Sequence, residues 1–354
     1  MKKHTKRSGT GMLAIWLGLT LLTGCFSPAD GDKADLTAAA APGERTLVIG
    51  AYSVVKDAMG ELLPAFQEHW LQQTGERIVF QESYEASGTQ ARSIAGGFEA
   101  DVTLLALEGD MDKLVRSGHV SPDWKEQPAG GMITRSIVVL GTREGNPKGI
   151  QDFEDLTLGD VRVLYPNPKT SGGAQWDINA IYGAGLRKAE AEGHPDPEAA
   201  AKQFLKQVHH NIESLDKSGR ASMAAFEYGV GDVIVTYENE LLARVAKGVP
   251  YDIVVPEDTI LIENPAAVVQ KYAQERGTTD LAEAFVSYLH APAAQETFVK
   301  HGFRPVNPKT WDQTQQQFAK PAGLFRIEDL GGWDHVREKL YSKRGIWYQV
   351  LAGI

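Results

Sequence analysis

Three short segments combine serine and glycine where a strand-like apolar run passes into a helical pattern. They are EASGTQ at 85–90, KTSGG at 169–173 and DKSGRAS at 216–222. The first turn of a helix has N–H groups without intrahelical partners and a partial positive charge, so it favours anions. Glycine lets the backbone approach a ligand closely, and a serine hydroxyl adds a neutral donor. If the three loops converge, they would surround a small tetrahedral anion with neutral donors.

Each loop also has a purely structural interpretation. Serine is a common helix N-cap and glycine is common in turns, so one such loop is more often structural than functional. Sequence spacing alone does not bring three loops together. The anion site is therefore a hypothesis that depends on their convergence.

A serine hydrolase is the alternative from another functional class. Ser171 or Ser87 would need a base within hydrogen-bonding distance, and the G-x-S-x-G pattern of a nucleophile elbow is absent. His209 and His210 fall at an expected helix end, and we predict that they face solvent. The sequence has no HExxH motif, cysteine pair or EF-hand-like loop, so we predict neither a metal site nor a cofactor.

From Thr46 onward, apolar runs alternate with helical patterns. Strands are expected at 46–51, 77–81, 101–107, 136–142, 161–166, 232–237 and 251–256, and helices at 54–73, 87–98, from about 173, at 197–208 and within 280–301. This alternation predicts an α/β fold with parallel sheets. Ligands of such sheets gather beyond the carboxyl ends of the strands, where the three loops should lie. The number of units predicts two lobes.

The N-terminus has the pattern of an export signal. Residues 1–11 carry four basic residues and no acid, and an apolar run of about a dozen residues follows at 12–23. The run ends at Leu22-Thr23-Gly24-Cys25, which resembles a bacterial lipobox, and Cys25 is the only cysteine of the chain. We predict a lipoprotein signal peptide at 1–24, a lipidated Cys25 and a flexible tether over 25–45. An ordinary signal peptide with an incidental cysteine is the alternative.

The overall charge argues against nucleic-acid binding. The 354-residue chain has a net charge of −10, and removal of residues 1–24 would leave 32 basic and 46 acidic residues, a net charge of −14. A nucleic-acid-binding protein normally carries a basic stripe, and none is found outside the N-terminus. Any bound anion must therefore be held by local donors, against the field of the whole molecule.

Several long motifs resemble the bacterial sulfate-binding proteins of ABC importers. They are YEASGTQARSIAGGFEADVTLLAL, GNPKGIQDFEDL, PNPKTSGGAQW, YGVGDVIVTYENELL and VVPEDTILIENPAAVV, in this order along the chain. The resemblance runs from about Thr46 to the GGW at 331–333. It implies a two-lobed, type II periplasmic-binding-protein-like fold, with a mostly parallel sheet flanked by helices in each lobe and the ligand in the cleft between them. We expect lobe 1 at 46–135 plus 257–354, and lobe 2 at 136–256.

The resemblance also implies a set of sulfate-binding residues. They are the hydroxyl and N–H of Ser87, the hydroxyl of Ser171, the backbone N–H groups of Gly172, Gly173 and Gly219, and the hydroxyl of Tyr237. Gly88, Ser53 and Arg220 are expected to support the site, and Arg220 to stabilise its loop rather than pair with the anion.

The sequence departs from the family pattern at four places. Tyr237 stands where the family has a tryptophan donor, Glu85-Ala86 replaces two glycines, Gln175 replaces an arginine and Ser53 an acid. These changes affect ligand identity more than fold. Molybdate or tungstate and phosphate therefore stay open as alternative ligands.

Proton chemistry favours sulfate among the tetrahedral anions. Sulfate carries no proton at neutral pH and suits a site made of donors, whereas monohydrogen phosphate needs an acceptor. The expected protein is a monomeric, lipid-anchored, extracytoplasmic solute-binding protein that delivers sulfate or thiosulfate to the transmembrane subunits of an ABC permease. It is not expected to be an enzyme. A sensor or adhesion protein that reuses the fold is a further alternative.

Overall fold

The computed structural model describes residues 44–354, which belong to one compact unit. The predicted signal peptide, Cys25 and all but the last two residues of the tether lie outside the described residues. Within the described residues, no helix combines the length and the apolar character needed to cross a bilayer.

The described strands form one mixed sheet. They are β1 (Glu44–Tyr52), β2 (Arg77–Glu85), β3 (Val102–Leu104), β4 (Met132–Thr142), β5 (Val163–Leu164), β6 (Ile212–Ser214), β7 (Val233–Tyr237), β8 (Asp252–Val254), β9 (Asp258–Val268), β10 (Arg304–Pro305) and β11 (Gly323–Phe325). The order is β2-β1-β3-β9-β4-β7-β5-β6, with β8 and β10 beside β4 and β11 beside β9. The predicted α/β fold is thus confirmed.

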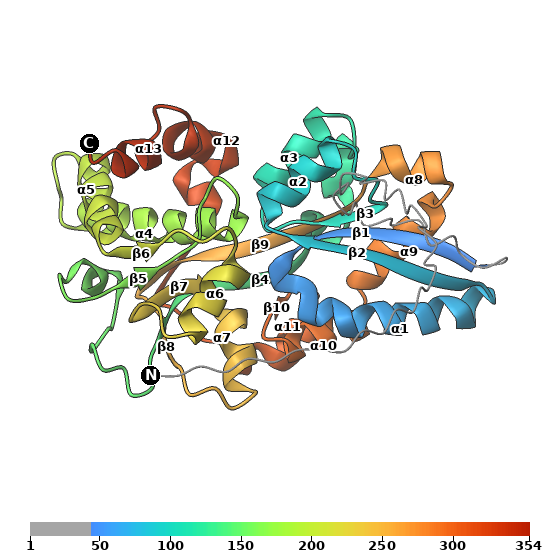
Figure 1. The fold of residues 1–354 in the computed structure, drawn as a ribbon, viewed down its shortest axis with the longest axis horizontal. Coiled ribbons are helices and arrows are strands. Elements are labelled where there is room, and N and C mark those ends of the chain that lie inside the picture. The colour runs from blue at the N-terminus through green and yellow to red at the C-terminus, as the bar shows by residue number, and fades with distance from the viewer. Residues whose placement is uncertain (1–43) are drawn as a thin grey trace, which may run out of the picture. The chain divides into compact units, whose positions relative to one another are not determined.

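Two long strands connect the halves of the sheet. β9 pairs with β3 through its C-terminal end and with the N-terminal half of β4 through its middle, and β4 continues to β7 and β8. Figure 1 shows both strands running between the two groups of helices. These pairings are antiparallel, whereas β1 with β2 and β3, and β5 with β6 and β7, are parallel. The sheet is therefore less uniformly parallel than predicted, because β4 and β9 pass from one half to the other.

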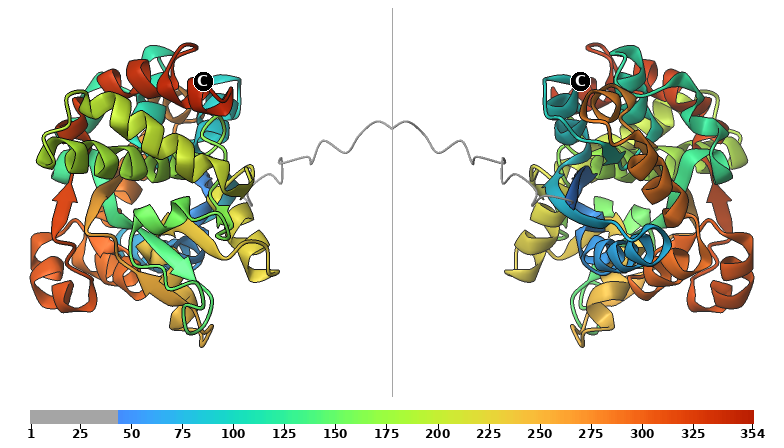
Figure 2. Two further views of the ribbon diagram at one scale, coloured as in Figure 1. Left: turned by 90° about the vertical axis from the view of Figure 1, so that its left-hand side faces the viewer. Right: turned by 90° about the vertical axis from the view of Figure 1, so that its right-hand side faces the viewer.

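Helices cover the sheet on both faces (Figures 1 and 2). They are α1 (Lys56–Thr74), α2 (Ser87–Ala95), α3 (Glu108–Arg116), α4 (Gly172–Ala191), α5 (Pro197–His210), α6 (Gly219–Glu227), α7 (Glu238–Val245), α8 (Gln270–Arg276), α9 (Thr279–Leu289), α10 (Pro292–Lys300), α11 (Pro308–Thr314), α12 (Gly332–Val336) and α13 (Ile346–Leu351). The expected helices at 54–73, 87–98 and 197–208 correspond to α1, α2 and α5.

Apolar side chains form separate cores in the two halves. α1 buries Met59, Leu62 and Phe66 against β1 and α9, and the Phe66 and Phe285 rings lie 5.0 Å apart in an edge-on arrangement. α4 buries Trp176 and Ile181 in a second core with β4, β5 and β7. Burial of an apolar side chain of this size stabilises the fold by about 1.5–3 kcal/mol.

The C-terminal segment packs on α4 and α5 (Figure 2). Phe325, Trp333 and Trp347 belong to the same core as Trp176, and the rings of Trp176 and Trp333 meet edge-on at 4.8 Å. This packing favours placing the tail with the 136–256 part of the chain, whereas we expected it in lobe 1. The lobe boundaries themselves stay a prediction.

His209 differs from its predicted environment. It is half-buried at the end of α5, where its Nδ1 lies 2.7 Å from the Tyr165 hydroxyl and its ring packs edge-on against Trp347. Burial lowers the pKa of His209. His209 is thus a packing residue rather than a solvent-facing one, because the C-terminal tail covers it; His210 is exposed as predicted.

Candidate anion-binding site

The three serine-glycine loops converge on one small cavity. Its lining comprises Tyr52, Ser53, Val54, Ala86, Ser87, Ala106, Pro166, Ser171, Gly173, Asp177, Ser218, Gly219, Thr236 and Tyr237. The cavity measures about 20 Å³, and about 10–15 Å³ is the least that holds one water molecule. It therefore suits a ligand of a few atoms and not a sugar or a peptide.

Hydrogen bonds to backbone carbonyls tie the loops to one another. The Gly88 N–H donates to the Thr170 carbonyl at 3.1 Å, which joins the first loop to the second. The Thr170 hydroxyl donates to the Lys217 carbonyl at 2.8 Å, which joins the second loop to the third. The indole N–H of Trp176 donates to the Ala106 carbonyl at 2.7 Å and adds a buried link between the halves. These bonds hold the loops in a closed arrangement around the cavity.

Serine N-caps prepare two of the helix N-termini for an anion. The Ser171 hydroxyl oxygen accepts from the Ala174 N–H at 3.3 Å at the start of α4, and the Ser218 hydroxyl oxygen accepts from the Ala221 N–H at 3.2 Å at the start of α6. Each cap occupies the third N–H of its helix and leaves the first two without an intrahelical partner. The Ser171 hydroxyl hydrogen also stays available as a donor.

The two glycines at the start of α4 have different roles. A Cβ on Gly172 would lie 2.9 Å from Ala106 Cβ and 3.2 Å from Ser87 Cβ, so only glycine fits there. Gly172 therefore lets α4 approach the first loop, and it does not itself line the cavity. A Cβ on Gly173 would face Ser171 Oγ at 3.3 Å and the Tyr237 ring at 3.5 Å, and Gly173 does line the cavity.

Ser87 differs from the role that the sequence predicted. Its hydroxyl donates to Asp110 Oδ2 at 2.6 Å and accepts from the Ala106 N–H at 2.9 Å, and Asp110 is fully buried. Lys113 Nζ donates to the other carboxylate oxygen of Asp110 at 2.6 Å. The hydroxyl hydrogen of Ser87 is thus committed to Asp110, and only the N–H at the start of α2 remains for an anion. Sequence reasoning missed Asp110 because it lies 23 positions away.

Tyr237 ends β7 with its hydroxyl in the cavity lining. The residue is 3% exposed, and its hydroxyl has no hydrogen-bond partner among the described residues. A buried polar group without a partner is costly, so this hydroxyl is a candidate donor to a bound ligand. Burial raises the pKa of the Tyr237 phenol well above its usual value, and nearby Tyr52 and Asp177 add to this effect. The Asn264 side chain lies close enough to act on the phenol and to lower its pKa, but burial is the larger effect. The phenol therefore stays neutral and able to donate.

The three expected supporting residues lie around the cavity. Ser53 lines it, and the Gly88 N–H bonds to the second loop as described above. Arg220 does not line the cavity: its guanidinium lies 3.4 Å from Asp57 of α1 and 3.5 Å from the Ser53 carbonyl. Sequence reasoning missed Asp57, which occupies the first turn of α1, four residues after Ser53.

Asp177 is the third acid near the site that the sequence interpretation missed, after Asp110 and Asp57. It lies one helical turn after Gly173 on α4, lines the cavity, and is 1% exposed. Its Oδ1 has no hydrogen-bond partner among the described residues. Burial raises the pKa of the Asp177 carboxyl well above its usual value, and the charge of Glu240 adds to the effect. The acid itself was visible in the sequence, because Asp177 is the last residue of the stretch PNPKTSGGAQWD.

No lysine or arginine lines the cavity within the described residues. The positive potential for an anion comes instead from the N-termini of α2, α4 and α6 and from neutral donors. No group of histidine, cysteine and acidic side chains in the described part of the chain could hold a metal ion.

Comparison with known proteins decides the family. Residues 47–304 match the family described as bacterial extracellular solute-binding protein. The chain belongs to this family. The solute-binding protein is 40% identical over 318 residues to a sulfate-binding protein of Synechococcus elongatus, covering 88% of each chain. It is 32% identical over 313 residues to a thiosulfate-binding protein of Escherichia coli, covering 86% of this chain and 91% of the relative.

A solved structure extends the similarity to three dimensions. The sulfate-binding protein SubI from Mycobacterium tuberculosis superposes on this solute-binding protein with a TM-score of 0.77 at 32% identity, over 84% of this chain and all of SubI. The resemblance to sulfate-binding proteins and the binding-protein fold, both predicted from sequence motifs, are thereby confirmed.

Proposed function

We propose that this protein binds sulfate outside the cytoplasm and delivers it to the permease of an ABC importer. The observation that carries the proposal is that three helix N-termini and the hydroxyls of Ser171 and Tyr237 converge on one cavity of about 20 Å³. No basic side chain of the described residues lines this cavity. The sulfate-binding relatives, similar over most of the chain, support the same ligand.

The proposed ligand contacts are neutral hydrogen-bond donors. They are the backbone N–H groups of Ser87, Gly172, Gly173 and Gly219 and the hydroxyls of Ser171 and Tyr237. Helix N-termini favour an anion without a formal positive charge. Sulfate, which has no proton at neutral pH, can accept from all of these groups at once.

Closure of two lobes over the anion would present one conformation to the permease. The hydrogen bonds from Gly88 to Thr170 and from Trp176 to Ala106 support a closed state, because they join loops on opposite sides of the cavity. Release would require these contacts to break. We further propose that the protein works as a monomer and that the chain crosses between the lobes near residues 136 and 256, with the C-terminal tail from Phe325 onward returning to pack on lobe 2.

The N-terminal signal supports a membrane-anchored form. We propose that Cys25 is lipidated after removal of residues 1–24 and holds the protein at the outer face of the cytoplasmic membrane, or facing the periplasm where an outer membrane exists. Mass spectrometry of protein from cells would detect the lipid on Cys25. Recovery of a mature form that lacks Cys25 would contradict the anchor.

A serine hydrolase has less support. No histidine lines the cavity within the described residues, and the carboxylate that accepts from Ser87 also bonds to Lys113. A serine nucleophile needs a base that can take its proton. We therefore propose a binding role without catalysis; covalent labelling of Ser87 or Ser171 by a fluorophosphonate would contradict it.

Isothermal titration with sulfate, thiosulfate, molybdate and phosphate at neutral pH tests the proposal. Tight one-to-one binding of sulfate with no response to phosphate is expected. Preference for thiosulfate would keep the class and change the ligand. Binding of phosphate or molybdate in place of sulfate would refute the ligand assignment.

A further inference from the structure

The anion cavity contains an acidic side chain. Asp177 lies at i+4 from Gly173 on the same face of α4. Helical side chains lean toward the N-terminus, so the Asp177 carboxyl covers the turn that begins at Gly173. Gly173 has no side chain that could separate this carboxyl from the helix N-terminus.

One oxygen of the Asp177 carboxyl is enclosed without a hydrogen-bond partner among the described residues. This oxygen is Oδ1, and the residue is 1% exposed. A buried carboxylate is normally paired with a cation or accepts several hydrogen bonds. Asp177 therefore lacks the partners that an ionised form requires.

The titratable groups that face Asp177 also lack a positive charge. They are Tyr52 at the end of β1, Tyr165 after β5, Tyr237 on β7, Glu240 on α7 and Tyr341 near the C-terminus. Glu240 is itself buried, and the nearest cation to it, Arg244, is 3.7 Å away. Burial and the nearby Glu240 both raise the pKa of Asp177.

We propose that Asp177 takes part in the anion site as a neutral carboxylic acid, so that sulfate binding and the protonation of Asp177 favour each other. The proposal rests on the proposed function. An ionised Asp177 would repel a dianion in the same small cavity, whereas the neutral acid can donate its O–H to an anion oxygen. Asp177 is then a specificity-determining residue of the site.

Thermodynamic linkage gives the direction of the pH effect. Sulfate prefers the protonated form, so binding raises the pKa of Asp177 further. The affinity for sulfate is at its maximum below the pKa that Asp177 has in the free protein. It falls by about tenfold per pH unit between this pKa and the higher pKa that Asp177 has in the sulfate complex. Over the same pH interval, the protein takes up close to one proton at Asp177 for each sulfate that binds.

The test is titration of the wild-type protein with sulfate between pH 5.5 and 9.5, repeated in buffers of different ionisation enthalpy. A fall in affinity with rising pH is expected, together with a buffer-dependent heat that reports proton uptake. An affinity independent of pH and a heat independent of buffer would overturn the proposal. This measurement needs no variant, so it does not depend on how a substitution affects folding.

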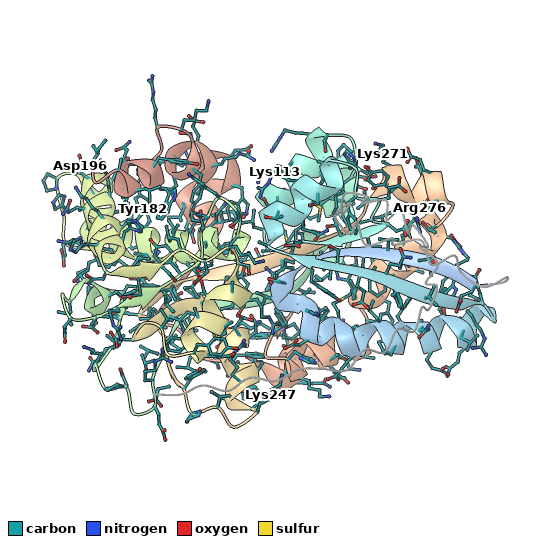
Figure 3. All side chains as sticks on the ribbon, viewed as in Figure 1. Lys113, Tyr182, Asp196, Lys247, Lys271 and Arg276 are labelled. Carbon is teal, nitrogen blue, oxygen red and sulfur yellow. The ribbon has the colours of Figure 1, made fainter. Side chains whose placement is uncertain are left out.

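The variant Asp177→Asn isolates the residue. Asparagine has the same shape and donates through its amide without titrating, so the fall at high pH should disappear and sulfate should still bind. The control is Asp196→Asn, an exposed N-cap at the start of α5 (Figure 3), where asparagine caps equally well. The control should keep the wild-type pH profile.

Phosphate provides the opposing outcome. If the wild-type protein binds phosphate and Asp177→Asn loses this binding, Asp177 is an ionised acceptor for a protonated anion, and the proposal is wrong. If neither sulfate nor thiosulfate binds at any pH, the proposed function itself fails. The two failures are therefore distinguishable.

Discussion

The unpartnered hydroxyl of Tyr237 gives the sharpest prediction. Tyr237→Phe removes one oxygen and keeps the ring, which lies beside Gly173. Because the hydroxyl makes no hydrogen bond of normal geometry with a described residue, the change disturbs at most its interaction with Asn264. In the bound state it removes one donor to a charged ligand, a loss of about 1.5–3 kcal/mol. Sulfate affinity should fall by about 10- to 150-fold.

Stability should respond in the opposite direction. Removal of a buried, unsatisfied hydroxyl relieves a desolvation cost of about 1–3 kcal/mol, so Tm without ligand should stay the same or rise. Isothermal titration gives the affinity, and thermal unfolding without ligand gives the stability. A weaker affinity together with an undiminished Tm would assign the hydroxyl to the ligand.

Tyr182→Phe is the matched control for this experiment. Tyr182, on α4 and labelled in Figure 3, is also buried, and its hydroxyl has no hydrogen-bond partner among the described residues. Tyr182 does not line the anion cavity. Its removal should leave sulfate affinity unchanged. The reasoning is refuted if Tyr237→Phe binds sulfate within about twofold of wild type, since a donor to a charged group contributes more than that.

Three further changes test separate parts of the structure. Ser171→Ala should weaken sulfate binding by about 1.5–3 kcal/mol, and it should also lower Tm because it removes an N-cap that contributes about 0.5–2 kcal/mol. An unchanged affinity in isothermal titration would exclude the Ser171 hydroxyl as a donor to sulfate. Arg304→Met should lower the free energy of unfolding in urea by about 3–5 kcal/mol, since it leaves Glu238 buried without the guanidinium that bonds it at 2.7 and 3.0 Å; a loss below 1 kcal/mol would contradict this. Asp57→Asn should speed sulfate release in stopped flow by less than about fivefold, because an exposed pair contributes less than about 1 kcal/mol; a larger effect would give the pair with Arg220 a greater role. Desolvation acts to raise the pKa of Asp57, but the neighbouring cations outweigh it and lower the pKa. The contribution of the Asp57–Arg220 pair to stability is therefore full above about pH 4–5 and is lost as the pH falls through the lowered pKa.

Local sequence patterns predicted the elements that carry the site. α2 begins at Ser87 and α4 at Gly172, next to the small residues that suggested helix N-termini. The strand at 258–268 escaped prediction, because Glu263, Asn264 and Pro265 interrupt its apolar pattern. Its pairing with β3 and β4 is a long-range property that a local pattern does not contain.

The side-chain partners of the site were harder to predict than its backbone. The commitment of the Ser87 hydroxyl to Asp110 depends on how α2 and α3 pack, and the ion pair of Arg220 with Asp57 joins residues 163 positions apart. The acid at 177 was visible, but its burial beside the cavity follows only from the packing of α4. Convergence of the three loops, which the sequence left open, is likewise a property of the folded sheet.

A crystal structure of the protein crystallised with selenate, a tetrahedral dianion with an anomalous scatterer, tests whether this cavity binds the anion. We expect one selenium peak in the cavity between the N-termini of α2, α4 and α6, with only neutral donors around it. A second cavity, whose lining includes Lys113, Lys169 and Arg337, would bind an anion through positively charged side chains instead of neutral donors. A peak at these basic side chains, with none at the three helix N-termini, would show that the anion site is misplaced.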